Sequence, residues 1–288
     1  MDKTEKDKAP PPAAPEKPKK SVKLLLIGGA GLVVLLLIGG GIAYFFLSSS
    51  PEDTSEEVSF TGKIKGMFSG KEKPKEIILL CAHYDSVVGS PGANDNGSAV
   101  ASLLEISRIF NQKPQKKTVR LVAFTNEEPP FFQKKSMGSR VYAQMCREQK
   151  EKILAMVSLE TIGYYSEAPK SQRYPPPLNF FYPDKGNFLG VVGNIQSRKL
   201  VKTFTQYFME GVDFPVECVA AFAFIPGIEW SDHSSFWKYG YPAIMVTDTA
   251  LYRYPYYHTP EDTPDKIDYP SLARVTYGIF YAAQRLAH

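Results

Sequence analysis

The sequence predicts an α/β domain of three layers, with a mostly parallel central sheet flanked by helices. Short, continuously apolar runs recur along the chain, and amphipathic stretches of helical spacing lie between them. Runs without polar alternation are typical of strands that are buried on both faces, as in parallel sheets. Strands that alternate with helices therefore favour a layered α/β fold.

Each expected element has its own signal. Buried strands are expected at 76–82 (EIILLCA), 119–125 (VRLVAFT), 153–159 (ILAMVSL) and 242–248 (PAIMVTD), and a more exposed strand at 60–68 (FTGKIKGMF). Helices are expected at 97–110, 198–211 and 270–287. Gly211 is suited to end the second helix, and Pro270 suits the first turn of the third.

Composition divides the chain into a leader at 1–23, an apolar run at 24–47, a linker at 48–59 and a globular domain at 60–288. The leader is rich in Lys and Pro, lacks aromatic residues and is expected to be disordered. It holds seven lysines against four acids, so most of the net charge of +4 lies there. The domain is nearly neutral and has no basic run, which excludes nucleic acid as a partner.

The apolar run at 24–47 predicts a transmembrane helix ahead of the domain. It is 24 residues long and uncharged, enough to cross the roughly 30 Å hydrocarbon layer of a membrane. A cleaved signal peptide is the alternative, but its apolar region usually spans only about 7–15 residues. Four lysines at 17–23 precede the run and four acids at 52–57 follow it. We therefore expect a single-pass anchor with a cytoplasmic N-terminus and an extracytoplasmic domain.

Polar residues follow the buried runs at the edge where α/β sheets bind ligands. The set comprises His83 and Asp85 after the first run, Asp95 in a turn before the first helix, Glu127 and Glu128 after the second run, Glu160 after the third, and Tyr257 with His258 after the fourth. Any one of these would be an ordinary surface residue. Together, the carboxylates and imidazoles are the donors that a metal site requires.

The number of carboxylates indicates two metal ions. Asp95, Glu128 and Glu160 would repel one another unless cations neutralise them. Two divalent ions roughly 3.5–4 Å apart, sharing one carboxylate, meet that need together with the imidazoles of His83 and His258.

Two further acids are left for other roles. Glu127 adjoins a ligand and is expected to act as the general base. Asp85 lies two residues after His83 and is expected to accept the second ring N–H of that histidine, which would fix its tautomer.

These motifs resemble a known family of hydrolases. HYDS, GANDNGSA, NEE, SLE, SDHSSFW and YHTPEDT, in this order from about residue 60 to the C-terminus, resemble the metallopeptidase family numbered twenty-eight, the zinc aminopeptidases with co-catalytic metals. The resemblance implies two zinc ions, one held by His83, Asp95 and Glu160 and the other by Asp95, Glu128 and His258. It also implies that Asp95 bridges the ions, that Glu127 is the base and that Tyr257 polarises the scissile carbonyl. His233 is expected not to be a ligand.

The resemblance implies a peptide with a free N-terminus as the substrate. Two alternatives stay open. The glutaminyl cyclases share the fold and most of the ligands but work as acyl transferases with one zinc, so the number of bound metals discriminates. The second alternative is a non-catalytic receptor or scaffold domain of the same fold. Such a domain would have lost metal ligands, and none of the five is lost here. Nothing in the sequence indicates the oligomeric state.

Overall fold

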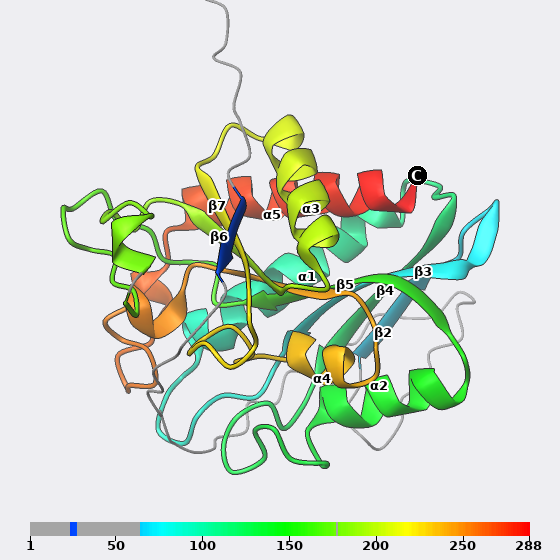
Figure 1. Cartoon of the computed structure of the whole chain (residues 1–288), viewed down its shortest axis with the longest axis horizontal. Helices are drawn as coiled ribbons and strands as arrows, with labels where there is room; N and C mark the ends of the chain where they lie inside the picture. Colours follow the sequence, from blue (N-terminus) through cyan, green and yellow to red (C-terminus); the bar gives the residue numbers. More distant parts are fainter. Residues whose placement is uncertain (1–23, 28–63, 177) are drawn as a thin grey trace, which may run out of the picture.

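A central sheet organises the chain, whose computed structural model describes residues 24–27, 64–176 and 178–288 (Figure 1). In this part of the chain the strand order is β1-β7-β6-β8-β5-β3-β4-β2. The strands are β1 (Leu24–Ile27), β2 (Ile64–Phe68), β3 (Lys73–His83), β4 (Lys117–Phe124), β5 (Lys152–Glu160), β6 (Leu189–Asn194), β7 (Val216–Ala221) and β8 (Ala243–Thr247). The β2–β4 and β6–β8 pairs are antiparallel and the other pairs are parallel, which confirms a mostly parallel sheet.

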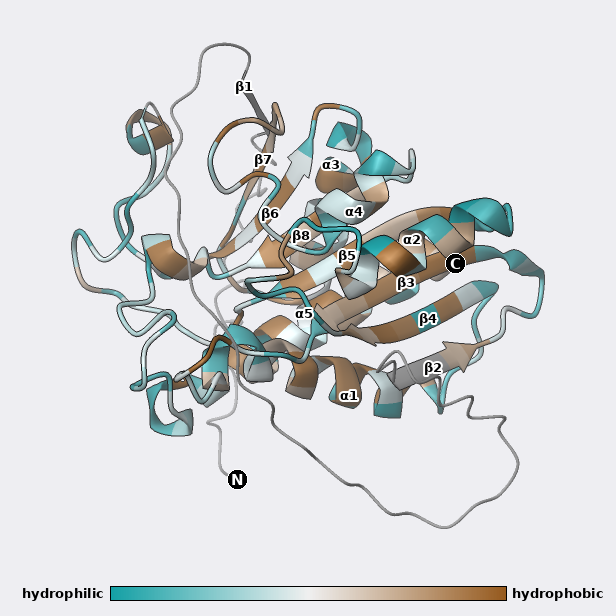
Figure 2. Ribbon diagram, turned by 90° about the horizontal axis from the view of Figure 1, so that it is seen from below, coloured by the Kyte–Doolittle hydropathy of each residue, from teal (hydrophilic) through white to brown (hydrophobic). Residues whose placement is uncertain are grey.

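Helices cover both faces of this sheet, as Figure 1 shows. One face carries α1 (Ala99–Phe110), α3 (Arg198–Gly211) and α5 (Tyr269–Ala287), and the other carries α2 (Gly138–Glu148) and α4 (His233–Lys238). In β3, Ile78 and Leu80 pack toward the first group, while Ile77 and Leu79 pack toward the second. Successive strand residues point to opposite faces, so a strand covered on both sides is apolar throughout. Figure 2 shows this apolar character along the central strands.

Most of the expected elements are confirmed. The four buried runs form β3, β4, β5 and β8, and the expected helices form α1, α3 and α5 within about two residues of their bounds. Residues 64–68 of the exposed run form β2, and residues 60–63 lie outside the described part. The strands β6 and β7 and the helices α2 and α4 were not predicted.

The first four residues of the predicted transmembrane helix do not form a helix. Leu24–Ile27 forms strand β1, which pairs with β7 in parallel, whereas the sequence predicts a helix there. Residues 28–47 of the expected span, the leader 1–23 and the linker 48–59 lie outside the described residues. Within residues 24–27, 64–176 and 178–288, no helix combines the length and apolar character needed to cross a membrane.

The loops at the carboxyl ends of β4, β5 and β8 hold an unusual backbone. Asn126, Thr161 and His258 have φ values of 58°, 42° and 61°, in the left-handed region that non-glycine residues rarely adopt. Such conformations persist only where the surrounding contacts enforce them, and they concentrate at functional sites. All three residues lie in the sequence beside, or among, the polar residues singled out above.

Candidate metal centre

The structure brings the five expected metal ligands together at the carboxyl edge of the sheet. His83 is the last residue of β3, Asp95 lies in the helical turn Ala93–Ser98 before α1, Glu128 follows β4, Glu160 is the last residue of β5, and His258 lies in the loop after β8. All except His258 are buried, and the side chain of His258 is 14% exposed. A parallel sheet places these strand ends side by side, which explains how residues distant in sequence meet.

Asp95 lies at the centre of this cluster. Its Oδ1 is 3.4 Å from His83 Nε2, and its Oδ2 is 3.0 Å from His258 Nε2. Glu160 Oε2 is 3.4 Å from the same His83 nitrogen, and Glu128 Oε2 is 3.4 Å from the same His258 nitrogen. Three groups of potential ligand atoms result. Two of them, His83–Asp95–Glu160 and Asp95–Glu128–His258, share Asp95, and the third is His83–Glu127–Glu128.

The donors in this cluster fit divalent cations. Both carboxylate oxygens of Asp95, Glu128 Oε1 and His258 Nε2 are buried, and although they lie close to one another they make no hydrogen bond of good geometry among the described residues. Buried polar atoms are nearly always hydrogen-bonded or bound to a metal, because desolvation without compensation is costly. Oxygens and imidazole nitrogens are the ligands that zinc accepts.

The charges within the cluster support the same conclusion. Burial opposes ionisation of Asp95, yet its contacts with the two histidines lower its pKa to about 2. Burial likewise opposes protonation of His258, yet Asp95 and Glu128 raise its pKa to about 10. Burial and the nearby Asp95 raise the pKa of Glu128 to about 7. The carboxylates therefore draw protons onto the imidazoles, and bound cations would take over that positive charge.

Glu127 lies beside the cluster. Its Oε2 is 3.9 Å from His83 Nε2, and its side chain is buried. Burial, reinforced by the nearby carboxylates of Glu160 and Glu128, raises its pKa well above the usual range. An acid that holds a proton readily at the edge of a metal cluster is suited to proton transfer.

The expected role of Asp85 is wrong in its details. His83 Nδ1 lies 3.0 Å from the main-chain oxygen of Asp85, while the carboxylate oxygen Oδ1 is 3.7 Å from that nitrogen. The carboxylate instead accepts the main-chain N–H groups of Glu127 at 3.3 Å and Glu128 at 3.1 Å. Asp85 thus orients His83 through its backbone, and its side chain fixes the segment that carries Glu127 and Glu128.

Asp262 holds the Asp95 turn, a role that the sequence did not suggest. This fully buried carboxylate accepts the main-chain N–H groups of Asn94 at 2.8 Å and Asp95 at 3.1 Å, and the hydroxyl of Tyr254 at 2.7 Å. Its place in PEDT, four residues after His258, was the only available signal. One carboxylate thereby joins the two segments that carry Asp95 and His258.

Two aromatic residues near the site take different positions. The ring of Tyr257 stacks on that of His258, with centroids 3.8 Å apart, and borders a cavity next to the cluster. The ring of His233 is fully buried, packs edge-on against Trp237, and lies 2.7 Å from the Ile228 carbonyl through Nε2. These contacts give His233 a structural role, consistent with its exclusion as a ligand.

Asp232 is a second buried acid that the sequence did not single out. It is fully buried, and neither of its carboxylate oxygens has a hydrogen-bond partner among the described residues. Burial, with the carboxylates of Glu160 and Asp85 adding to it, raises its pKa from the usual 3.8 to about 7. Ser231 beside it donates to Glu160 Oε2 at 2.7 Å, so this segment also supports a candidate ligand.

We expect the substitution Asp232→Asn to stabilise the zinc-free protein at pH 8. The folded state keeps the Asp232 proton up to about pH 7, whereas the unfolded chain loses it near pH 4. The contribution of Asp232 to stability therefore falls as the pH rises from about 4 to 7, by on the order of 1 kcal/mol per pKa unit. Urea unfolding at pH 5 and pH 8 measures the difference, with the exposed Asp265→Asn as control. Equal destabilisation at both pH values would contradict this assignment.

The chain has the features of a metal-dependent hydrolase. It combines a layered α/β architecture with a cluster of carboxylates and imidazoles at the edge of the sheet. The chain belongs to peptidase family M28, whose family profile matches residues 63–283, and is thereby a zinc metallopeptidase. It is 41% identical over 239 residues to the uncharacterized protein YfbL of Escherichia coli. The aligned region covers 78% of this chain and 72% of that relative.

Solved structures share the fold. A zinc aminopeptidase from Bacillus subtilis, BSAP, superposes with a TM-score of 0.58 at 26% identity, over 77% of this chain and 48% of that one. A glutaminyl cyclase from Fimbriiglobus ruber superposes with a TM-score of 0.53 at 18% identity, over 77% of this chain and 74% of that one, a likeness of fold alone. The chain thus spans about half the length of the solved aminopeptidase.

Proposed function

We propose that this chain is an aminopeptidase that works with two zinc ions and a glutamate general base. The observation that carries the proposal is the position of Asp95, whose two carboxylate oxygens face two different imidazoles. A carboxylate shared in this way is typical of two-metal hydrolytic sites. A site for one ion needs no such sharing.

The residues present would hold the two ions as two overlapping groups. His83, Asp95 and Glu160 form one group, and Asp95, Glu128 and His258 form the other. When bound, zinc would supply Lewis-acid activation of a water nucleophile and of the scissile carbonyl. Ser231 and Asp262 hold Glu160 and the Asp95 turn in place.

Glu127 and Tyr257 would perform the remaining chemistry. Glu127 takes the proton from the attacking water and passes it to the leaving amine, a role that suits a buried carboxyl whose Oε2 lies 3.9 Å from His83 Nε2 at the edge of the cluster. Tyr257 borders the cavity next to the cluster, and burial raises the pKa of its phenol well above the usual range. The phenol therefore keeps its proton and would donate a hydrogen bond to the oxygen of the scissile carbonyl.

A substrate with a free N-terminus follows from the similarity to the Bacillus subtilis zinc aminopeptidase. The test is hydrolysis by the zinc-loaded full chain of paired peptides that differ only in N-terminal acetylation, with mass-spectrometric identification of the products. We expect chelator-sensitive release of single N-terminal residues from the free peptides alone. Equal cleavage of the acetylated peptides, or cyclisation of N-terminal glutamine without hydrolysis, would overturn the aminopeptidase proposal.

We also propose that the N-terminal part of the chain attaches the enzyme to a membrane, with the catalytic domain outside the cytoplasm. Support comes from the uncharged run at 24–47 and from the lysines that precede it. The proposal requires that Leu24–Ile27 leave their pairing with β7 when the run spans the membrane. Protease added to intact cells is expected to remove the C-terminal domain and to spare the leader. A domain that stays protected until the cells are lysed would contradict this topology.

A further inference from the structure

The side chain of Asn96 holds the backbone on both sides of Glu160. Its Nδ2 donates to the Leu159 carbonyl oxygen at 3.0 Å, and its Oδ1 accepts the main-chain N–H of Thr161 at 3.0 Å. Asn96 is only 2% exposed, so both hydrogen bonds are shielded from water, which strengthens them. Because Asn96 directly follows Asp95, one side chain joins the segments that carry two candidate ligands.

These two hydrogen bonds reproduce one rung of a parallel sheet. In a parallel ladder, one residue bonds to the peptide groups before and after its partner on the neighbouring strand. The ladder between β3 and β5 ends with Cys81 paired to Ser158. Two residues further on, the same register would pair His83 with Glu160. The amide of Asn96 takes the two hydrogen bonds that this rung would form.

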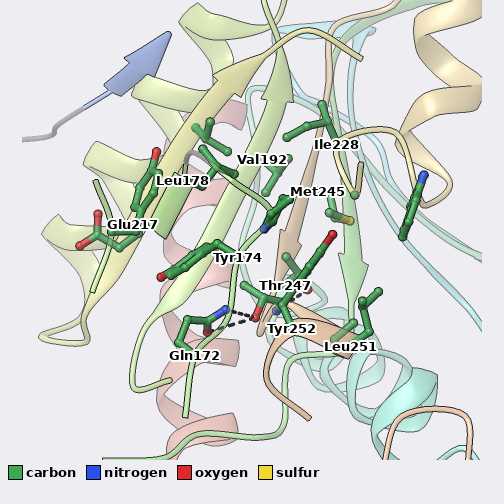
Figure 3. A pocket seen from close by; sticks show the side chains of 18 of the residues that line it. Gln172, Tyr174, Leu178, Val192, Glu217, Ile228, Met245, Thr247, Leu251 and Tyr252 are labelled. Atoms are coloured by element: carbon green, nitrogen blue, oxygen red, sulfur yellow. Dashed lines mark hydrogen bonds between the residues drawn. The ribbon is translucent and has the colours of Figure 1, made fainter. Parts of the chain in front are cut away.

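The backbone at Glu160 is therefore held from both sides. On the β8 side it keeps a strand partner, because Glu160 pairs with Thr247, which lines the cavity next to the cluster (Figure 3). On the β3 side the amide of Asn96 takes the place of a strand. The ligands of a functional site must be held to within about 0.5 Å of their working positions, so this contact bears directly on metal binding.

Two neighbours of Asn96 in the same turn bind further along the segment. Ser98 Oγ accepts the main-chain N–H of Ile162 at 3.1 Å, and Asn94 Oδ1 accepts that of Gly163 at 2.9 Å. Both contacts lie past the ligand. The contact of Asn96 differs because it reaches the two peptide groups that flank the ligand itself.

We infer that Asn96 is a positioning residue, which fixes Glu160 against Asp95 and thereby sets the zinc affinity of the His83–Asp95–Glu160 group. Asn96 supplies no atom to this group and acts through the backbone of Glu160. The inference rests on the proposed zinc site and adds the residue that holds one of its two groups together.

The test measures zinc binding to the full chain by equilibrium dialysis, for the wild type and for Asn96→Leu. Leucine has nearly the shape of asparagine but can neither donate nor accept a hydrogen bond. We expect zinc affinity at the His83–Asp95–Glu160 group to fall by about 10–100-fold, the usual loss when a supporting residue of a metal site is removed. Asn96→Ala guards against a misfit of the leucine side chain and is expected to give a loss in the same range.

A matched control separates this effect from a general loss of stability. Ser102→Ala removes a buried hydrogen bond of 2.7 Å between Ser102 in α1 and Thr276 in α5. It is expected to lower the Tm and to leave zinc affinity unchanged. Excess zinc is expected to restore peptide hydrolysis in Asn96→Leu, because this variant keeps every group that touches the substrate or the metal.

Double variants assign the loss to one of the two groups. Glu128→Gln weakens the other group, and in this background Asn96→Leu is expected to lower the affinity of the remaining zinc by the same factor as in the wild type. Glu160→Gln weakens the group that contains Glu160, and there Asn96→Leu is expected to change the remaining affinity by less than about threefold.

Unchanged zinc affinity in Asn96→Leu, or an equal loss in both backgrounds, would overturn the inference while the aminopeptidase function stands. An equal loss in Ser102→Ala would overturn it as well. If the wild type binds one zinc ion, the two-metal function fails, and the inference holds only if Asn96→Leu weakens that ion and Glu160→Gln removes it. If the wild type binds no zinc, both fail.

Discussion

Replacing Glu127 with glutamine is expected to reduce kcat by roughly a thousandfold while both zinc ions stay bound. The substitution keeps the shape of the side chain and removes its capacity to take up a proton. Glu127 lies outside the two groups that share Asp95, so zinc affinity at those groups is expected to change little.

Steady-state kinetics with a free-amino peptide and zinc analysis of the same sample measure both effects. The exposed Glu148→Gln on α2 is the matched control and is expected to keep full activity. Near-normal turnover of Glu127→Gln with two zinc ions bound would rule out Glu127 as the base. Loss of zinc from this variant would instead show that Glu127 is a metal ligand.

Asp95→Asn is expected to weaken zinc binding at both groups at once. Asp95 contributes an oxygen toward His83 and another toward His258, at 3.4 Å and 3.0 Å. An amide has a single oxygen and no negative charge, so neither group keeps its full donor set. We expect zinc affinity to fall by at least about a hundredfold at both groups, since losing even a supporting residue of a metal site costs about 10–100-fold.

Equilibrium dialysis against zinc measures this loss directly, without reference to activity. Glu160→Gln is the informative comparison, because it belongs to one group only and is expected to leave the other filled. The exposed Asp265→Asn controls for a changed carboxylate elsewhere. Retention of one tightly bound zinc by Asp95→Asn would show that Asp95 is not shared.

The central part of the fold could be predicted because its strands are buried on both faces. The runs that became β3, β4, β5 and β8 are continuously apolar for that reason. The strands β6 (LGVVGN) and β7 (VECVAA) are interrupted by glycine or glutamate, since their residues also form the floor of the cavity. Their apolar runs are therefore short and interrupted, which is why the sequence did not predict these two strands.

The candidate ligands could be predicted because each one follows a predicted strand or lies in its loop. The contacts that hold these ligands in place could not be predicted. Asp262 binds main-chain groups 167 and 168 positions away, and no local pattern encodes such a pairing. The carboxylate of Asp85 was assigned to His83 from their spacing, but the backbone places the Asp85 carbonyl nearer to the ring.

The number of zinc ions bound per chain tests the central claim most directly. The metal-free full chain would be titrated with zinc while native mass spectrometry counts bound ions and a free-amino peptide reports hydrolysis. The shared position of Asp95 predicts two zinc ions per chain and a loss of activity when either is removed. Saturation at one zinc ion, with no hydrolysis gained beyond it, would contradict the two-metal aminopeptidase and favour a single-metal enzyme such as a glutaminyl cyclase.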